Sequence, residues 1–403
     1  MSAEIRIPEA SVVQAALRTT TERLAQELGQ PTDTSPSWSE FEWRAARAAA
    51  AIHGVGPLLA TSLRWHGPPE WQTFLADQRA HTEKRHQRIE ALAQCIDQHA
   101  RQAGIPMVAL KGAALHALGL YRAGQRPMAD LDLLVEEADM APATRLLEAQ
   151  SFHTHLTYWK NRIFESGGEA ATGLGEHCDN QIKVELHWRI RERLPLELTD
   201  VSDVVFPSNF RPGFNPYPSR AALLTHLVLH AAGGIVSREL RLLHLHDLAL
   251  VSRSLQDKDW DEILSRGESG TWWFLPPLQL TGRYYPGVVP SPVLSKLQRS
   301  CPARLNRVTA RQCLTDVSLS SVWIRAFPGL RWSRSAAESL RYVLGRVRPN
   351  AEALAIRKAD SISARWASDS PWQGLSQRSR IVRWMTSRPT RTATMYVVRE
   401  ALR

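Results

Sequence analysis

Two aspartates in one short segment have the spacing of metal ligands. Asp130 and Asp132 alternate with Leu131 and Leu133, which predicts a strand. Because successive side chains of a strand point to opposite faces, both carboxylates would lie on one face of a sheet. Their mutual repulsion would be relieved by a divalent cation, and hard oxygen donors suit Mg2+ better than zinc. The alternative is a solvated pair at the end of a surface strand.

A third acidic residue follows in a later segment, 181–190, which also alternates. Its apolar face consists of Ile182, Val184, Leu186, Trp188 and Ile190. Glu185 and His187 lie on the opposite face. If this strand lies beside that of Asp130, Glu185 completes a cluster of three carboxylates able to hold two ions. Such ions could activate an attacking hydroxyl and stabilise a leaving pyrophosphate in an in-line displacement.

The turn that precedes the aspartates is suited to a phosphate. Apolar residues 106–110 predict a buried strand and residues 114–120 a short helix. The glycine between them lets the backbone approach a ligand closely, and the first amides of a helix point at an anion. Lysine and arginine near the turn would neutralise triphosphate charge, with a structural ion pair as the alternative for each. The candidate nucleotide contacts are Lys111, Gly112, Ala113 and Arg126.

Together these motifs resemble the nucleotidyltransferase fold of the DNA polymerase beta superfamily. More narrowly, three stretches within about residues 45–255 are similar to a bacterial family of uncharacterised nucleotidyltransferases: Leu110-Lys-Gly-Ala-Ala, Arg126-Pro-Met-x-Asp-x-Asp-Leu-Leu-Val and Val184-Glu-Leu-His-Trp. The resemblance implies transfer of a nucleoside monophosphate from a nucleoside triphosphate such as ATP to an acceptor hydroxyl or phosphate. It also implies two Mg2+ ions, with Mn2+ as a substitute.

Within this resemblance, Asp130, Asp132 and Glu185 become the catalytic and metal-binding residues. Glu185 would hold the ion that lowers the pKa of the acceptor, or would take the proton itself. His187 would contact the acceptor or serve only as a hydrogen-bonded neighbour. The acceptor is a small molecule, a peptide, a protein or RNA, and the family's associations suggest a biosynthetic setting.

The surrounding periodicity predicts an α/β (α+β) fold in which a small mixed sheet is flanked by helices on both sides. Helices are expected at 8–28, 38–53, 58–65 and 68–101. The polar face of the long fourth helix, which includes Arg79, His81, Glu83, Lys84, Arg85 and Arg88, is predicted to be solvated. A Gly-rich and polar loop, 167–180, is expected to border the acceptor site. The predicted regions are an N-terminal helical region (1–103), the catalytic core (104–215), a helical domain (216–290) and a basic helical region (291–403).

Histidines in the helical domain offer a second metal chemistry. His230, His246 and Asp247 resemble the ligand pattern of an HD-type metal phosphohydrolase, although the final aspartate of that pattern is not clearly placed. The competing interpretation is that these histidines pack and cap helices. A further alternative is a catalytically inactive nucleotidyltransferase-like binding protein, with the basic region as its anchor.

Positive charge is concentrated at the end of the chain. Residues 291–403 contain 21 Lys and Arg against 6 Asp and Glu, whereas the whole chain carries a formal charge of +10. Tryptophans are interleaved with these arginines, as in a surface for nucleic acid or an anionic membrane; the alternative is a helical appendage whose arginine stems cover indole faces. These tryptophans are Trp323, Trp332, Trp366, Trp372 and Trp384.

The remaining composition is that of an ordinary globular protein, with 43% hydrophobic and 22% charged residues in 403. No run of 18 apolar residues predicts a transmembrane segment, and the first residues lack the apolar core of a signal peptide. We therefore expect a cytoplasmic location. The four cysteines form no Cys-x-x-Cys pair, so neither a zinc ribbon nor a disulfide framework is predicted.

Overall fold

A six-stranded mixed sheet forms the centre of the fold. The computed structural model describes residues 7–167, 174–265, 268–351, 354 and 375–403. The strand order is β3-β4-β5-β2-β1-β8, with β2 parallel to β5 and β1 parallel to β8, and the other neighbours antiparallel. The strands are β1 Pro106–Ala109, β2 Asp130–Leu134, β3 His153–Thr157, β4 Asn161–Glu165, β5 Lys183–His187 and β8 Gly213–Asn215. The predicted mixed sheet is confirmed.

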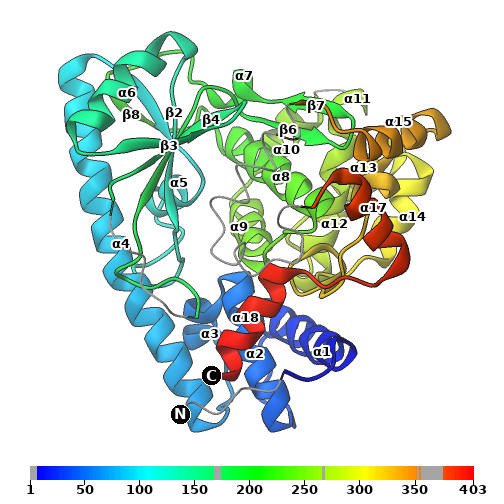
Figure 1. Cartoon of the computed structure of the whole chain (residues 1–403). Helices are drawn as coiled ribbons and strands as arrows, with labels where there is room; N and C mark the ends of the chain where they lie inside the picture. The colour runs from blue at the N-terminus through cyan, green and yellow to red at the C-terminus, as the bar shows by residue number, and fades with distance from the viewer. Residues whose placement is uncertain (1–6, 168–173, 266–267, 352–353, 355–374) are drawn as a thin grey trace.

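Two helices, α4 (Pro69–Ala103) and α6 (Met140–Ala149), cover one face of the sheet (Figure 1). Their apolar side chains and those of the strands form one buried cluster, which includes Ile89, Ile96, Leu131, Leu133, Val184 and Leu186. These are the residues that the alternation assigns to the buried face. The carboxylates on the same strands therefore face away from α4, towards the helices that follow the sheet.

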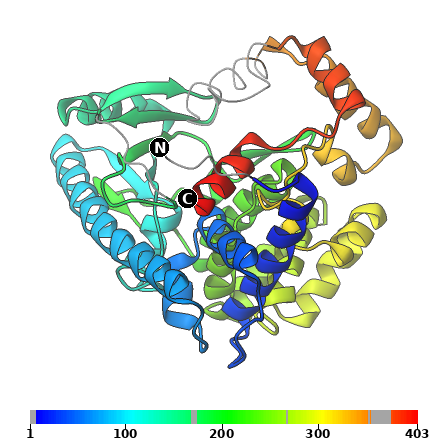
Figure 2. The same ribbon diagram turned by 60° about the horizontal axis from the view of Figure 1, so that its bottom comes forward.

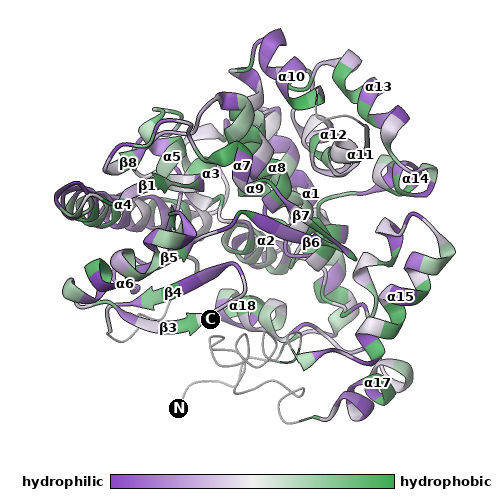
Figure 3. Ribbon diagram, turned by 90° about the horizontal axis from the view of Figure 1, so that it is seen from above, coloured by the Kyte–Doolittle hydropathy of each residue, from purple (hydrophilic) through white to green (hydrophobic). Residues whose placement is uncertain are grey.

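The helical part is built from both ends of the chain. Its N-terminal helices are α1 Ala10–Gly29, α2 Glu40–His53 and α3 Gly56–Ser62, close to the predicted ranges. After the sheet come α8 Arg220–Ser237, α9 Leu242–Arg253, α10 Asp257–Leu264, α11 Glu268–Thr271, α12 Leu275–Tyr284, α13 Ser291–Ser300 and α14 Ala303–Arg311. In Figure 3, α8 and α9 lie near the centre of this part. By length and composition α8 could cross a membrane, but 67% of it is buried, as in the core helix of a globular protein.

The last described helices are α15 Ala336–Val347, α17 Gln377–Thr386 and α18 Thr392–Leu402. The last of these packs beside α2 (Figures 1 and 2). Arg47 and Arg44 on α2 donate hydrogen bonds of 2.6 and 3.2 Å to the carbonyl oxygens of Ala401 and Leu402. Arginine side chains thus satisfy carbonyls that the end of a helix leaves without partners.

One of the tryptophans expected along a basic groove, Trp332, lies in the core instead. Trp332 is 3% exposed and meets Trp272 edge to face at 6.0 Å, so it cannot stack on a base. Trp323 forms an isolated bridge with Thr390 through its backbone. Trp366 and Trp372 lie outside the described residues. The basic region therefore contributes at least one tryptophan to the core, and a polyanion partner stays a prediction.

Candidate active site

The predicted juxtaposition of acidic residues is present in the sheet. Because β2 and β5 are neighbours and parallel, Asp132 pairs in register with Glu185, and Asp130 with Lys183. The side chains of Asp130, Asp132 and Glu185 share one face of the sheet. That face is opposite the one buried under α4 and α6.

A hydrogen-bond network fixes two of the three carboxylates. Asp132, only 5% exposed, accepts hydrogen bonds on Oδ1 from Lys111 Nζ at 2.7 Å and His187 Nε2 at 3.0 Å. The same His187 nitrogen lies 3.4 Å from Glu185 Oε2, which also accepts a hydrogen bond of 2.8 Å from Asn161 Nδ2. His187 is thus the hydrogen-bonded neighbour that the sequence allowed, and contact with an acceptor stays a prediction.

The aspartates differ in their tendency to ionise. Burial raises the pKa of Asp132, but the attraction of Lys111 and the hydrogen bond from His187 outweigh burial and hold that pKa well below its usual range. Asp130 has no comparable support: burial first, then repulsion by Asp132 and Glu185, raise the pKa of Asp130 to about 7. Near neutral pH, the ionised form of Asp130 is therefore not fully stabilised, and a bound cation would stabilise it.

The variant Asp130→Asn tests this electrostatic imbalance. Between the ordinary aspartate pKa of 3.8 and about 7, the folded protein binds more protons at Asp130 than the unfolded chain, so its stability falls as pH rises through this window. The asparagine is neutral throughout. In chelator, we expect Asp130→Asn to be more stable than wild type by ~1–3 kcal/mol at pH 8 and by much less at pH 5. Urea unfolding at both pH values measures this, and equal stability at pH 8 would contradict it.

The donor set at this site fits a divalent cation. Ligand atoms of Asp132, Glu185 and His187 all lie within 4.8 Å of one another. Oδ1 of Asn161, the amide oxygen beside Glu185, is buried and has no hydrogen-bond partner in the described structure. Lys111 Nζ contacts Asp132 where a metal ion would bind. A bound ion would therefore either share Asp132 with Lys111 or displace the lysine. Carboxylate and amide oxygens suit Mg2+, and the imidazole nitrogen would also accept Mn2+.

The position of Lys111 depends on α8. Its backbone has a left-handed φ of 45°, which an L-residue adopts only at a cost. Its N–H donates to the Tyr217 hydroxyl at 3.4 Å, and that hydroxyl is hydrogen-bonded to Nδ1 of His226 on α8 at 2.7 Å. Burial lowers the pKa of His226 well below its ordinary value, so its ring is neutral and can accept. The helix following the sheet thereby holds the turn that carries the lysine.

The turn residue Gly112 is closely packed against neighbouring side chains. A Cβ atom there would clash with the side chains of Arg126 and Met128. Glycine at this position is therefore explained by close packing, and the phosphate contacts of Gly112 and Ala113 stay predictions. The helix that begins here is short, α5 Lys111–Ala117.

The structure supports the ion-pair alternative for Arg126. The guanidinium forms a two-pronged contact with Asp247 on α9, with Nε–Oδ1 and Nη2–Oδ2 distances of 2.9 and 2.8 Å. Tyr121 donates a further hydrogen bond of 2.6 Å to Asp247. All three side chains are buried. Arg126 thus joins the core to the helical part, and triphosphate binding is not the role that its geometry supports.

These contacts also argue against the phosphohydrolase alternative. His230 packs its ring on that of His244 at 4.7 Å, and His246 Nδ1 lies 3.1 Å from the Tyr285 hydroxyl. Both oxygens of Asp247 are engaged by Arg126 and Tyr121. In the described part of the chain, no metal-binding group contains His230, His246 or Asp247. These histidines pack and hydrogen-bond within a helical core.

A small cleft opens beside the carboxylates and is rich in cations. The space within it is about 20 Å³, and its charged lining residues are Lys111, Lys160, Arg189, Arg191 and Glu192. His187 and two histidines of α8 complete the polar wall. Small-molecule sites usually enclose ~300–1,000 Å³, so this space takes about one water molecule, and a nucleotide would lie across the mouth of the cleft. Lys160 and Arg191 were not predicted, because only the sheet's tertiary arrangement brings them to the site.

Arg85 on α4 supports the two strands that carry the carboxylates. It is 1% exposed, which makes the prediction of a solvated position wrong. Its guanidinium donates to the carbonyl oxygens of Met128 and Ala129, just before β2, at 2.6 Å each. It also donates to those of Asn180 and Gln181, just before β5, at 2.5 and 3.0 Å. One buried arginine thereby fixes the starts of both strands.

A mixed sheet with acidic residues on two adjacent strands, flanked by helices, is the architecture expected of a nucleotidyltransferase. Residues 39–272 match the model of a family described as uncharacterised nucleotidyltransferase, and the chain belongs to this family. Neither the curated proteins nor the solved structures yield a significant match. Membership supports a general function in nucleotidyl transfer.

Proposed function

We propose that the protein is a Mg2+-dependent nucleotidyltransferase that moves a nucleoside monophosphate from a triphosphate donor to an acceptor hydroxyl or phosphate. The observation that carries this proposal is the in-register pairing of Asp132 with Glu185, with Asp130 one pleat away on the same face. A sheet gains no stability from three acids on one face, as the raised pKa of Asp130 indicates. A binding protein without activity would not need this arrangement.

Asp130, Asp132 and Glu185 would hold the metal ion or ions. When bound, Mg2+ would lower the pKa of the attacking hydroxyl and neutralise charge on the triphosphate. Asn161 orients Glu185 through its 2.8 Å hydrogen bond, and Glu185 would accept a proton from the acceptor. His187 holds Asp132 and Glu185 in a fixed relation by contacting both.

The cationic wall of the cleft would receive the triphosphate. Lys160 directly precedes β4, and Arg191 follows β5. Both line the cleft, and each has a neighbouring side chain that stabilises its positive charge. Lys160 pairs with Glu192 at 2.5 Å, and the Arg191 guanidinium lies over the Trp159 ring at 4.7 Å. Lys111 has its Nζ on Asp132 and would contact both the carboxylate and a phosphate oxygen. The acceptor would approach from the mouth of the cleft.

Thermal unfolding with nucleoside triphosphates tests the proposal without knowledge of the acceptor. Each triphosphate is added with Mg2+ or with chelator, at about 100 times its dissociation constant. A ligand at this concentration adds ~2.7 kcal/mol, which should raise the melting temperature by a few degrees. We expect the shift for at least one triphosphate, only with Mg2+, and not in the double variant Asp130→Asn/Asp132→Asn.

The matched control for this experiment is Glu137→Gln. Glu137 is an exposed carboxylate that follows β2 and pairs with Arg189 at 3.3 Å at the surface. It should leave the nucleotide-dependent shift unchanged. A shift of equal size in the double variant would show that Asp130 and Asp132 do not take part in nucleotide binding.

A further inference from the structure

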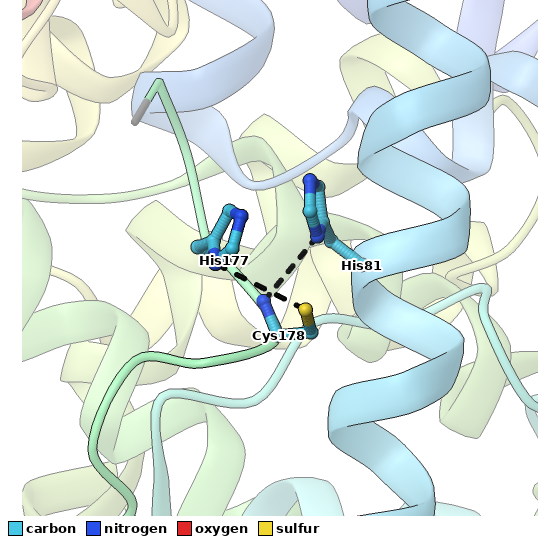
Figure 4. Close-up of side chains that lie close together, drawn as sticks. All are labelled: His81, His177 and Cys178. Carbon is cyan, nitrogen blue, oxygen red and sulfur yellow. Dashed lines mark hydrogen bonds between the residues drawn. The ribbon is translucent and has the colours of Figure 1, made fainter. Parts of the chain in front are cut away.

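A second group of metal-ligand side chains lies away from the carboxylates. His81 on α4 meets His177 and Cys178 from the segment that precedes β5 (Figure 4). One ligand atom of each residue lies within 4.8 Å of the others. The Cys178 backbone N–H lies 3.5 Å from His81 Nδ1, and the two imidazole rings are 3.9 Å apart at their centroids. Residues 97 positions apart in sequence therefore converge on one point.

One pair of ligand atoms lies near the spacing of a tetrahedral zinc site. With Zn–N bonds of about 2.0–2.1 Å and Zn–S bonds of about 2.3 Å, neighbouring ligand atoms are roughly 3.3–3.7 Å apart. The Cys178 Sγ and His177 Nδ1 are separated by 3.9 Å. Small side-chain rotations would bring the three atoms to bonding distance. Cys178 is only 8% exposed, which shields its sulfur, while both histidines remain accessible to an incoming ion.

We infer that His81, His177 and Cys178 form a zinc site. Two imidazole nitrogens and one thiolate are a donor set that favours zinc over Mg2+, in contrast to the oxygen-rich set on the sheet. The fourth position is open to water or to Asp179, whose Oδ2 lies 3.5 Å from His177 Nδ1. The inference is independent of the proposed function.

The position of the zinc site in the fold indicates what a bound ion would do. Arg85, one helical turn beyond His81, already binds the carbonyl oxygens of Asn180 and Gln181, and Arg88 binds that of Cys178. A zinc ion would add a bond between α4 and the segment leading into β5, since Cys178 lies five residues before Lys183, where the strand that carries Glu185 begins. It would stabilise the protein and hold this approach to the active site in place.

The experiment measures metal content after purification without chelators and desalting. We expect close to one zinc per chain in wild type, and its loss in His81→Ala and in Cys178→Ser. Cys95→Ser is the matched control, because Cys95 has a histidine neighbour, His99, at 3.6 Å but belongs to no group of three ligands in the described chain. It should retain the zinc. Asp132→Asn should also retain it, which separates this site from the carboxylates.

A second measurement uses wild type alone, so that it does not depend on the folding of a variant. Zinc is removed with chelator and Co2+ is added. We expect a near-ultraviolet charge-transfer band from thiolate to cobalt, and a melting temperature several degrees higher with zinc than without it. Absence of both zinc and the cobalt band from wild type would overturn the inference. So would zinc retention in His81→Ala and Cys178→Ser, or zinc loss in Asp132→Asn alone.

Discussion

Asp132→Asn and Glu185→Gln should each reduce nucleotidyl transfer by ~10³-fold or more. Each change removes a charge from the cluster that would bind the ion and leaves a side chain of nearly the same size. Asp132→Asn also withdraws the counter-charge from half-buried Lys111, so part of its effect would be a loss of stability. Pyrophosphate release and unfolding by urea, measured on the same preparations, separate the two effects.

Of the two variants, Glu185→Gln is expected to change the stability of the fold less. The glutamine can still accept the hydrogen bond from Asn161, whose donor lies 2.8 Å from Oε2, and Lys111 keeps Asp132 as its partner, while His187 loses the charge of Glu185 at 3.4 Å. We expect its stability to lie within ~0.5–1 kcal/mol of wild type. Glu137→Gln is again the control and should keep full activity. Activity retained in both Asp132→Asn and Glu185→Gln would show that the chemistry lies elsewhere.

Arg85→Met should destabilise the protein by ~3–5 kcal/mol, although Arg85 is neither a ligand of the proposed metal nor a lining residue of the cleft. Methionine fills much of the same space but donates no hydrogen bond, so four buried or part-buried carbonyl oxygens before β2 and β5 lose the hydrogen bonds from Arg85. Glu176, 3.5 Å from the guanidinium, loses its partner too. Urea unfolding monitored by tryptophan fluorescence measures this cost.

Arg79→Met on the same helix is the matched control for Arg85. Arg79 is exposed, and surface substitutions of this kind change stability by about ±0.5 kcal/mol. Comparable effects of the two substitutions would show that Arg85 is not the support that its hydrogen bonds indicate. At temperatures where both variants are folded, Arg85→Met should also bind nucleotide more weakly, since it loosens both strands of the site.

The sequence predicted the elements whose periodicity is strong. Alternation in β2 and β5 placed Asp132 and Glu185 on one face, because each strand buries its apolar side under α4 and α6. The hairpin of β6 (Arg191–Leu194) and β7 (Glu197–Asp200) and the short strand β8 were missed. The hairpin is polar, and β8 is only Gly-Phe-Asn, so neither has an apolar alternation to detect.

The surroundings of the site could not be predicted, since they depend on contacts between distant residues. Arg126 has the same charge whether it binds a phosphate or Asp247, which lies 121 residues away in the chain. Arg85 follows the charged pattern of a solvated helix face, yet four backbone carbonyl oxygens from two loops surround it. Cys178 belongs to no cysteine motif, and its histidine neighbour on α4 is brought there only by the fold.

The measurement that tests nucleotidyl transfer most directly follows the label of a nucleoside triphosphate. Triphosphate labelled on the α- or the γ-phosphorus is incubated with Mg2+, the protein and a cell extract as the source of acceptors. We predict that α-label enters an acceptor and that γ-label leaves as pyrophosphate, and that Glu185→Gln does neither. Transfer of γ-label to the acceptor, or its release as inorganic phosphate alone, would contradict the assignment.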